Sequence, residues 1–418
     1  YFEKVKQDKF SILDKVKDIQ TKENVQITLS IAISNDGMTD KEKYKSAQAA
    51  MDVVLGRGGD QAVIRENEIY KFYGGRAQEV EKRTKVKARV VAHALENLIK
   101  DASKVMIMGH TNPDIDSMGS SMGIYRLAKS LDKKAYIIDS SETNTLQSFK
   151  ADLAKEPEYE DILITKEVAE ENIDKETLVV VVDTHKTTYV EAPELLKRTD
   201  KIVIIDHHRR SADYIENATL TFQEVYASSA AELVTELLQY AEVHVDLKTI
   251  EAESLYAGIM MDTKNFTFKT GVRTFEAAAY LRRCGVNIIR VKKWFQSNLD
   301  TFNKIAGIVK KAEIVNETIA IATYEKKDKE ASLICAKAAD ELLTISDITA
   351  SFVMGKVGNK ICISGRSIGD INVQIILEKL GGGGHITLAG AQVEGMTIEE
   401  TKQELINRIN EYFSEIEN

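Results

Sequence analysis

Four apolar runs in this sequence are each followed at once, or within two residues, by an acidic residue or a histidine. Residues 105–108 precede His110, residues 178–182 precede Asp183, residues 202–205 precede Asp206, and residues 257–261 precede Asp262. The first three runs have the length and composition of buried strands, and helical patterns lie between them. Strands that alternate with helices form a doubly wound parallel sheet, which carries its functional groups at the carboxyl ends of the strands. The pattern predicts an α/β fold with polar side chains gathered at one sheet edge.

The side chains at this edge are of the types that bind divalent metals. They are His110, Asp114, Asp116, Asp183, Asp206, His207, His208 and Asp262, with no cysteine among them. A single acidic residue after a strand is usually a turn or cap residue, but several carboxylates that converge would repel one another without a cation. Carboxylates and imidazoles suit hard or borderline metals. The set predicts a binuclear site that activates water for attack on phosphorus.

The order of these residues suggests separate roles. Asp183 ends a run of five apolar residues, which places it at the end of a buried central strand, where it is suited to bridge two ions. His207 and His208 are adjacent, and neighbours in extended chain point to opposite sides, so one can bind metal while the other faces the substrate. Asp262 ends a helix-like segment and would complete the second ion's ligands. We therefore expect Asp183, His207 and His208 to carry the chemistry.

A second candidate site lies near the C-terminus. Four glycines, residues 381–384, precede His385, and Arg366 lies in a Ser-Gly-Arg-Ser segment upstream. Backbone without Cβ atoms can approach a phosphate closely and donate N–H groups, and the two side chains add cationic donors. A helix C-cap would need one glycine rather than four. We expect Gly382, Gly383, Gly384, His385 and Arg366 to bind the substrate.

The pattern along the chain predicts three parts, residues 1–80, 81–290 and 302–418. Expected helices are 10–19, 46–55, 79–100, 117–131, 146–153, 190–197, 230–240, 336–343 and 372–380; expected strands include 27–33, 105–108, 135–138, 178–182, 202–205, 319–324, 351–357 and 360–366. The part from 103 to 285 is the doubly wound sheet. The last part is a smaller α/β domain, and residues 286–301 are expected to connect the two.

Composition limits the partners of this chain. A formal net charge of −9 over 418 residues argues against a nucleic-acid coat, so duplex nucleic acid is not expected as a partner. No apolar run reaches the ~18 residues of a membrane span. The sequence begins at Tyr1 within ordinary folded sequence, so we expect an excised fragment that lacks upstream targeting or membrane segments. The three cysteines, Cys284, Cys335 and Cys362, are far apart, which is typical of reduced thiols in a cytosolic protein.

The motif series His110-x3-Asp114-x-Asp116, Asp183, Asp206-His207-His208 and Asp262 resembles the DHH phosphoesterase superfamily, and the Gly-Gly-Gly-Gly-His segment resembles its DHH-associated C-terminal domain. The resemblance spans residues 103–394 and implies a Mn2+-dependent phosphodiesterase with two ions in each active site. One ion would be held by His110, Asp114 and Asp183, and the other by Asp116, Asp183, His207 and Asp262. Asp206 would orient its neighbours, and His208 would contact the scissile phosphate. Arg366, the glycine run and His385 would contact the substrate.

The N-terminal part narrows the resemblance. The strand 27–33, the helix 46–55 and the Gly-Arg turn after it look like the distal half of a degenerate GGDEF domain. Gly58-Gly59-Asp60 is not expected to be the GGDEF signature, because that hairpin precedes this strand in the fold. The combination resembles the GdpP-type cyclic-di-AMP phosphodiesterases, which are anchored in the cell membrane by upstream segments and linearise cyclic di-AMP to 5′-pApA. The resemblance implies a cytoplasmic fragment, a cyclic dinucleotide substrate and a homodimer.

Three other functions are compatible with these residues. A nanoRNase or RecJ-like exonuclease would use the same metals on short linear oligonucleotides. A nucleotide-binding sensor would have a vestigial metal site, although the complete ligand set argues against decay. A DHH-type pyrophosphatase fits less well, because the GGDEF-like part and the glycine run point to a nucleotide substrate.

Overall fold

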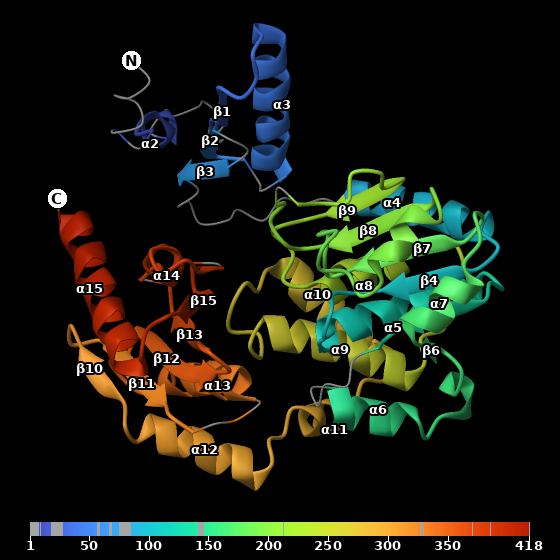
Figure 1. Cartoon of the computed structure of the whole chain (residues 1–418). Coiled ribbons are helices and arrows are strands. Elements are labelled where there is room, and N and C mark those ends of the chain that lie inside the picture. Colours follow the sequence, from blue (N-terminus) through green and yellow to red (C-terminus); the bar gives the residue numbers. More distant parts are fainter. Residues whose placement is uncertain are drawn as a thin grey trace. The chain divides into compact units, whose positions relative to one another are not determined.

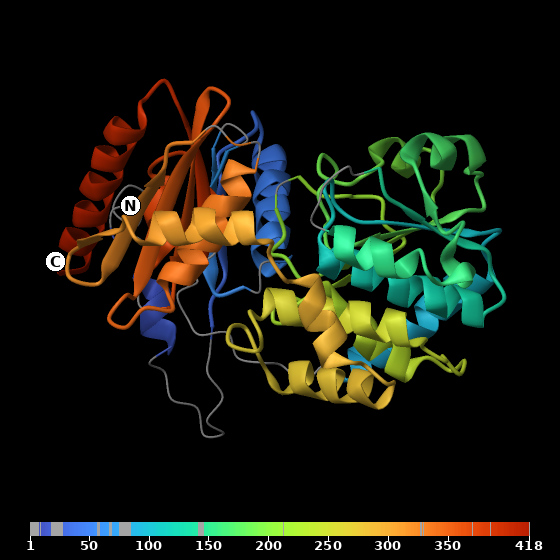
Figure 2. The same cartoon turned by 90° about the horizontal axis from the view of Figure 1, so that it is seen from below.

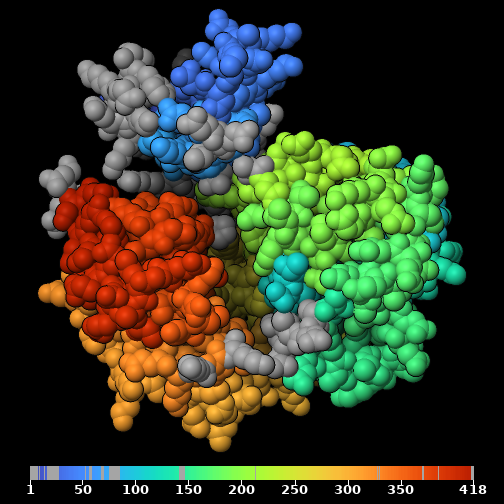
Figure 3. Space-filling model, viewed as in Figure 1, coloured from blue at the N-terminus to red at the C-terminus, as the bar shows by residue number. Residues whose placement is uncertain are grey.

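The computed structural model of the chain describes residues 8, 10–17, 28–56, 59–66, 69–74, 85–140, 146–211, 213–326, 328, 330–369, 371–384 and 386–417. Figure 1 shows the elements, and Figure 3 shows the surface of the described residues in colour. The chain divides into two compact units, Tyr1–Phe295 and Gln296–Asn418, each with its own core. The predictions for His385, for residues 18–19 and 79–84 of two expected helices and for residue 27 of an expected strand concern positions outside the described residues.

The first unit is built around a six-stranded sheet in which every pair of neighbouring strands is parallel. Its strands are β4 (Val105–Met108), β5 (Ala135–Ile138), β6 (Leu163–Ile164), β7 (Leu178–Val182), β8 (Ile202–Asp206) and β9 (Leu220–Gln223). The order β6-β5-β4-β7-β8-β9 reverses between β4 and β7. Open α/β sheets bind ligands at this reversal point, outside the carboxyl ends of the strands. The predicted doubly wound sheet is confirmed.

Alternate residues of these strands face two separate cores. Val105 and Ile107 pack into the larger core with α4 (Lys85–Lys100), α5 (Ile115–Ser130), α8 (Ala230–Tyr240), α9 (Thr249–Asp262) and α10 (Val272–Arg283). Met106 and Met108 pack on the opposite face with α7 (Lys166–Asn172) and the 3-10 helix η3 (Pro193–Lys197). The sheet is therefore buried on both faces, as the near-continuous apolar strands require.

The remaining elements of this unit are α6 (Gln147–Leu153), η2 (Pro157–Tyr159) and α11 (Ile288–Trp294). The helix expected over residues 190–197 was wrong in its first half, because Val190 pairs with His110 in an isolated β-bridge and only Pro193–Lys197 is helical. The connector expected after residue 286 is largely helical, since it contains α11 and the start of α12. Strands β6 and β9 are two and four residues long, which is too short for the sequence pattern to separate them from loops.

Ahead of this sheet, the chain forms a small three-stranded sheet in the order β1-β2-β3. It contains β1 (Ile31–Ser34), β2 (Gln61–Glu66) and β3 (Ile69–Gly74), with helices α2 (Ile12–Lys17) and α3 (Asp40–Gly56). Ala50 and Val54 of α3 pack on Val63 of β2. The strand expected over residues 27–33 is present as β1, but residues 28–30 are not part of it, and α3 begins six residues earlier than the predicted start at Ser46.

The second unit has a mixed six-stranded sheet between two layers of helices. Its strands are β10 (Glu313–Val315), β11 (Ile319–Tyr324), β12 (Ala350–Val357), β13 (Lys360–Ser367), β14 (Gly383–Gly384) and β15 (Leu388–Glu394). Helices α12 (Leu299–Val309) and α13 (Ala331–Leu342) cover one face, and α14 (Val373–Glu378) and α15 (Ile398–Glu417) cover the other (Figure 2). The smaller α/β domain expected here is confirmed.

Two general features of the chain complete this description. Among the described residues, no helix combines the length and the apolar character needed to cross a membrane. All three cysteines are free thiols.

Candidate metal centre

The loop after β4 carries the first histidine of the cluster. The Nδ1 atom of His110 lies 2.9 Å from the carbonyl oxygen of Thr111, so this nitrogen carries the proton and donates. Its Nε2 atom lies 3.5 Å from Asp183 Oδ2 and 3.9 Å from Asp114 Oδ2. A backbone hydrogen bond that fixes one nitrogen of an imidazole leaves the other as the metal-binding atom. His110 therefore presents Nε2 to two carboxylates.

Asp114 and Asp116 are both fixed by helix starts. Asp114 is the N-cap of α5, and its Oδ1 accepts hydrogen bonds from the backbone N–H groups of Asp116 and Ser117. The carboxylate of Asp116 accepts hydrogen bonds from Ala230 and Ala231, at the start of α8, at 2.8 and 2.9 Å. A helix N-terminus stabilises a negative charge. Both side chains are thus held before any ligand binds.

The approach of Asp116 depends on a glycine in the next helix. A Cβ atom on Gly258 of α9 would lie 2.7 Å from Asp116 Oδ1 and 2.9 Å from the Cβ atom of Ala231. Since α5, α8 and α9 meet at this point, any larger residue at position 258 would push the carboxylate out of place. Gly258 therefore serves the geometry of the cluster.

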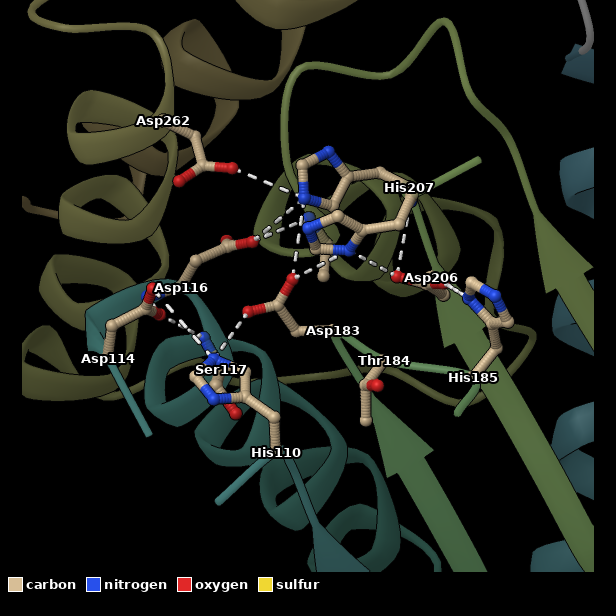
Figure 4. A network of polar contacts seen from close by, with 12 residues as sticks. His110, Asp114, Asp116, Ser117, Asp183, Thr184, His185, Asp206, His207 and Asp262 are labelled. Atoms are coloured by element: carbon tan, nitrogen blue, oxygen red, sulfur yellow. Dashed lines mark hydrogen bonds and ion pairs between the residues drawn. The ribbon is translucent and has the colours of Figure 1, made fainter. Parts of the chain in front are cut away.

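Asp183 occupies the centre of the cluster, directly after β7 (Figure 4). Its Oδ1 lies 3.3 Å from His207 Nε2, and its Oδ2 lies 3.5 Å from His110 Nε2. Its backbone has a φ of 60°, in the left-handed region, and its N–H donates to the carbonyl oxygen of Ile205 at 2.9 Å. Such a conformation costs about 1–2 kcal/mol outside glycine and is typical of functional sites. One carboxylate therefore faces two separate histidines.

His207 and Asp262 form the far side of the cluster. His207 Nε2 lies 3.2 Å from Asp262 Oδ2 and 3.9 Å from Asp116 Oδ2. Asp262 is the last residue of α9, as the sequence predicts. Three buried atoms, the Oδ1 of Asp183 and both ring nitrogens of His207, make no hydrogen bond of normal geometry within the part of the chain that the structure describes. Buried polar atoms are rarely left in this state unless a ligand satisfies them.

Asp206 does not face the other carboxylates but holds two histidines. Its Oδ2 lies 2.5 Å from His185 Nδ1, and its Oδ1 lies 2.8 Å from His208 Nδ1. The side-chain amide of Gln223 donates to the carbonyl oxygen of His208 at 2.8 Å. Asp206 is fully buried, whereas the side chain of His208 is 43% exposed. Asp206 thus orients His208 at the open side of the cluster.

The charges of the cluster are not balanced by its own residues. Burial, with Asp183 and Asp262 nearby, raises the pKa of Asp114 to about 7, and burial with Asp183 raises the pKa of Asp262 to about 7. Burial opposes protonation of His110, but Asp183 and Asp114 outweigh it and raise its pKa to about 9. Burial and the neighbouring His208 lower the pKa of His207. Crowded carboxylates of this kind are stabilised by cations.

Three groups of these residues have the spacing of metal ligands. They are His110 with Asp114 and Asp183, Asp116 with His207 and Asp262, and Asp183 with His207 and His208, and in each group the ligand atoms lie within 4.8 Å of one another. The donors are carboxylate oxygens and imidazole nitrogens, the set that suits Mn, Fe or Zn. The unpartnered atoms of Asp183 and His207 fit the same interpretation. The cluster could hold divalent metal ions, and Asp183 takes part in two of the groups.

Family models match three successive segments of the chain. They are described as the DHH family N-terminal domain, over residues 104–259, the DHHA1 domain, over residues 308–415, and the GGDEF domain of cyclic-di-AMP phosphodiesterase GdpP-like proteins, over residues 1–72. The chain belongs to the DHH family. The predicted resemblance is confirmed for all three parts.

Curated relatives of this DHH-family chain are longer proteins. It is 44% identical to the cyclic-di-AMP phosphodiesterase GdpP of Geobacillus thermodenitrificans and 41% identical to the cyclic-di-AMP phosphodiesterase PdeA of Listeria monocytogenes, over 98% of this chain in both cases. The chain spans 63% of the length of each. Among solved structures, an exopolyphosphatase-related protein from Bacteroides fragilis is 20% identical with a TM-score of 0.68, covering 79% of this chain and 98% of that one. That similarity concerns the fold.

The DHHA1 domain contains the other predicted site residues. Arg366 lies on β13 and is 9% exposed. Its Nε donates to Asp340 Oδ1 at 2.9 Å, and its Nη1 donates to the carbonyl oxygen of Gly365 at 2.9 Å. The guanidinium group therefore already has an anionic partner in its own domain.

The glycine run has local roles in this domain. Gly381 has a φ of 76° after α14, and the N–H of Gly382 donates to the carbonyl oxygen of Leu377, as in a helix C-cap. A Cβ atom on Gly382 would lie 2.3 Å from the carbonyl oxygen of Gly390, and one on Gly384 would lie 2.4 Å from that of Leu388. Strand β15 therefore requires both glycines. Gly383 meets nothing within 4 Å, and its contribution to binding stays a prediction.

Three residues of the DHH domain's centre were missed by the sequence reasoning. His185 and Gln223 contact Asp206, and Tyr189 stacks on His110. The position of His185, two residues after the strand-end Asp183, could have indicated it. Gln223 and Tyr189 reach the site through β9 and through the bridge between His110 and Val190, which the local pattern does not reveal.

Proposed function

We propose that this chain is a Mn2+-dependent phosphodiesterase that hydrolyses cyclic di-AMP to 5′-pApA with two ions in its active site. The observation that carries the proposal is the Asp183 carboxylate, which faces His110 with one oxygen and His207 with the other. A carboxylate in this position is suited to lie between two ions a few ångströms apart.

The substrate is proposed from the relatives. Two proteins named cyclic-di-AMP phosphodiesterases are 44% and 41% identical over 98% of this chain. The ligand set His110, Asp114, Asp116, Asp183, His207 and Asp262 is complete in this sequence. This supports an active enzyme rather than a nucleotide sensor with a decayed site. Anchoring in the cell membrane, a cytoplasmic location and dimerisation stay predictions.

In the proposed reaction, each residue of the cluster has a separate task. His110, Asp114 and Asp183 would hold one ion, and Asp116, Asp183, His207 and Asp262 would hold the other. Two such ions supply the Lewis acidity that activates water and stabilises the charge on the phosphoryl oxygens. His208, held by Asp206 at the exposed side, would contact the scissile phosphate and donate a proton to the leaving 3′ oxygen.

The binding of the rest of the substrate is assigned to the DHHA1 domain. Arg366, Gly382, Gly383, Gly384 and His385 would contact the nucleotide there. Since Arg366 is paired with Asp340, it would bind a phosphate by sharing its guanidinium between two anions or by exchanging one for the other.

The test is a hydrolysis assay with Mn2+ that offers cyclic di-AMP, cyclic di-GMP and linear pApA side by side, with the products separated by chromatography. We expect fast conversion of cyclic di-AMP and accumulation of pApA. Metal content of the purified protein, measured by mass spectrometry, should approach two ions per chain. Preferential cleavage of pApA to AMP would instead identify a nanoRNase, and an absence of bound metal would identify a sensor.

A further inference from the structure

Tyr189 lies beside the candidate metal centre, where it stacks on His110. Its ring is parallel to the imidazole of His110, with the planes at 2° and the centroids 5.2 Å apart. The residue is nevertheless 46% exposed, whereas the side chain of His110 is 11% exposed. One side of the ring is therefore occupied by an imidazole, while nearly half of the residue's surface is accessible to a ligand.

The backbone around Tyr189 is held in place. The N–H of Thr111 donates to the carbonyl oxygen of Tyr189 at 2.8 Å, and the N–H of Glu191 donates to that of Gly109 at 3.0 Å. Val190 between them pairs with His110 in the β-bridge. The ring is therefore positioned before a ligand binds, and an aromatic side chain loses little conformational entropy when a ligand packs on it.

The electrostatic surroundings suit a flat, uncharged partner. A tyrosine hydroxyl is neutral at physiological pH, and the His110 ring on which Tyr189 stacks lies beside the carboxylates of Asp114 and Asp183. The acids beside it discourage a second anion at this spot, while the metal centre takes the phosphate. A group attached to that phosphate and able to stack on an aromatic ring is a nucleobase.

We propose that Tyr189 is the platform on which a nucleobase of the substrate stacks while the adjoining phosphate lies at the metal centre. This inference rests on the proposed function for the identity of the substrate. It adds a residue that recognises the base within the DHH domain, separate from the contacts assigned to the DHHA1 domain.

A rival role for Tyr189 is to orient His110 alone, and binding measurements separate the two. The probes are AMP, which has the base, and ribose 5-phosphate, which lacks it, titrated against the Mn2+-loaded chain by calorimetry. The wild type should bind AMP about 5- to 150-fold more tightly, the range that stacking on an aromatic side chain provides. In Tyr189→Ala this preference should fall to about onefold, while the affinity for ribose 5-phosphate and for Mn2+ stays unchanged. Tyr189→Phe should keep the preference.

The matched control is Tyr44→Ala, because Tyr44 is an exposed tyrosine on α3, outside the metal centre. Three results would overturn the inference: no preference for AMP in the wild type, an undiminished preference in Tyr189→Ala, or an equal loss for both probes together with weaker Mn2+ binding. The last result would assign Tyr189 to the orientation of His110. Failure of the proposed function would be seen separately, in the hydrolysis assay: a wild type that leaves cyclic di-AMP intact could still prefer AMP to ribose 5-phosphate in the titration.

Discussion

The candidate metal centre of the DHH domain and the Arg366 region of the DHHA1 domain differ in whether their buried charges are offset by charges of opposite sign. In the metal centre, Asp114, Asp116 and Asp262 have raised pKa values because burial and mutual repulsion are not offset by cations of the protein. In the DHHA1 domain, Arg366 is 9% exposed and is paired with Asp340. An added cation would stabilise the carboxylates of the first region, whereas Arg366 already has an anionic partner and must share or exchange it to bind another anion.

The binding free energy would have a different source in each region. Ions that enter the metal centre remove repulsion among carboxylates that are already in place, so binding there gains from preorganisation. A phosphate that reaches Arg366 competes with Asp340, and its net gain is smaller. Substitutions in the two regions should therefore differ in size and in the kinetic constant that they change.

The largest effect is expected from Asp183→Asn. Asparagine tolerates the left-handed backbone of position 183, so the fold should persist, but its amide cannot supply a negative charge between two ions. Turnover of cyclic di-AMP should fall at least about 1000-fold, the loss of a group that stabilises the transition state directly. Activity and circular dichroism together check this.

The control for that substitution is Asp132→Asn. Asp132 also has a left-handed backbone, with a φ of 56°, but it is exposed after α5 and outside the metal centre. It should retain full activity. Equal activity in Asp183→Asn and the control would contradict the assignment of the bridging carboxylate.

A smaller effect, of another kind, is expected from Arg366→Ala. Loss of one charged hydrogen-bond donor costs about 1.5–3 kcal/mol, so KM should rise about 10- to 100-fold while kcat changes little. Steady-state kinetics with cyclic di-AMP measures both constants. Arg408→Ala, which removes a half-buried arginine paired with Glu404 and Glu411 on α15, should leave both unchanged. A fall in kcat alone would assign Arg366 to the reaction step rather than to substrate binding, and the two regions would then not differ in the kinetic constant that they change.

The smallest effect concerns Asp152, a carboxylate of the DHH domain that already has hydrogen-bond donors around it. Hydrogen bonds from Lys155 and Trp294 lower the pKa of Asp152 to about 2. A lowered pKa in the folded state stabilises the protein above the unfolded value of about 4, and this stability is lost as the pH falls toward 2. Asp152→Asn should therefore cost about 1 kcal/mol of unfolding free energy at pH 5 and progressively less below pH 4.

Denaturation followed by fluorescence measures that effect locally, because Trp294 is the single tryptophan of the chain. The exposed Asp161, changed to asparagine, is the reference. A difference between Asp152→Asn and the wild type that does not depend on pH would show that pairing does not set the ionisation of Asp152. The presence or absence of cationic partners would then no longer explain why the pKa of Asp152 is lowered while that of Asp114 is raised.

The sequence was most informative where the fold follows from local pattern. Apolar runs that end in His110, Asp183 and Asp206 predict parallel strands, and parallel strands bring their carboxyl ends together, so the residues of the metal centre could be predicted as a group. The role of each residue depends on contacts across the chain. The capping of α8 by Asp116 joins residues more than a hundred positions apart, and no spacing in the sequence indicates it.

The sequence was least informative where one residue type serves two purposes. The glycine run suggested a phosphate cradle, but Gly382 and Gly384 are also required by the close approach of β15. Residues 190–197 were expected to form a helix, yet the pairing of Val190 with His110 makes the start of this segment extended. In both cases a tertiary contact overrides the local preference, and the same contact brings Tyr189 to the metal centre.

The capping of α8 by Asp116 has a thermodynamic consequence. The Asp116 Oδ2 atom that lies 3.9 Å from His207 Nε2 also accepts the N–H of Ala230, at the start of a helix that packs on α4 and α10. The affinity of the cluster for an ion and the position of α8 should therefore depend on each other, and this coupling is equal in both directions. A partner that displaced the start of α8 would weaken the hold on an ion, and an ion would resist that displacement by the same free energy. The helix could thus transmit an event at the surface of the domain to its chemistry without touching the substrate.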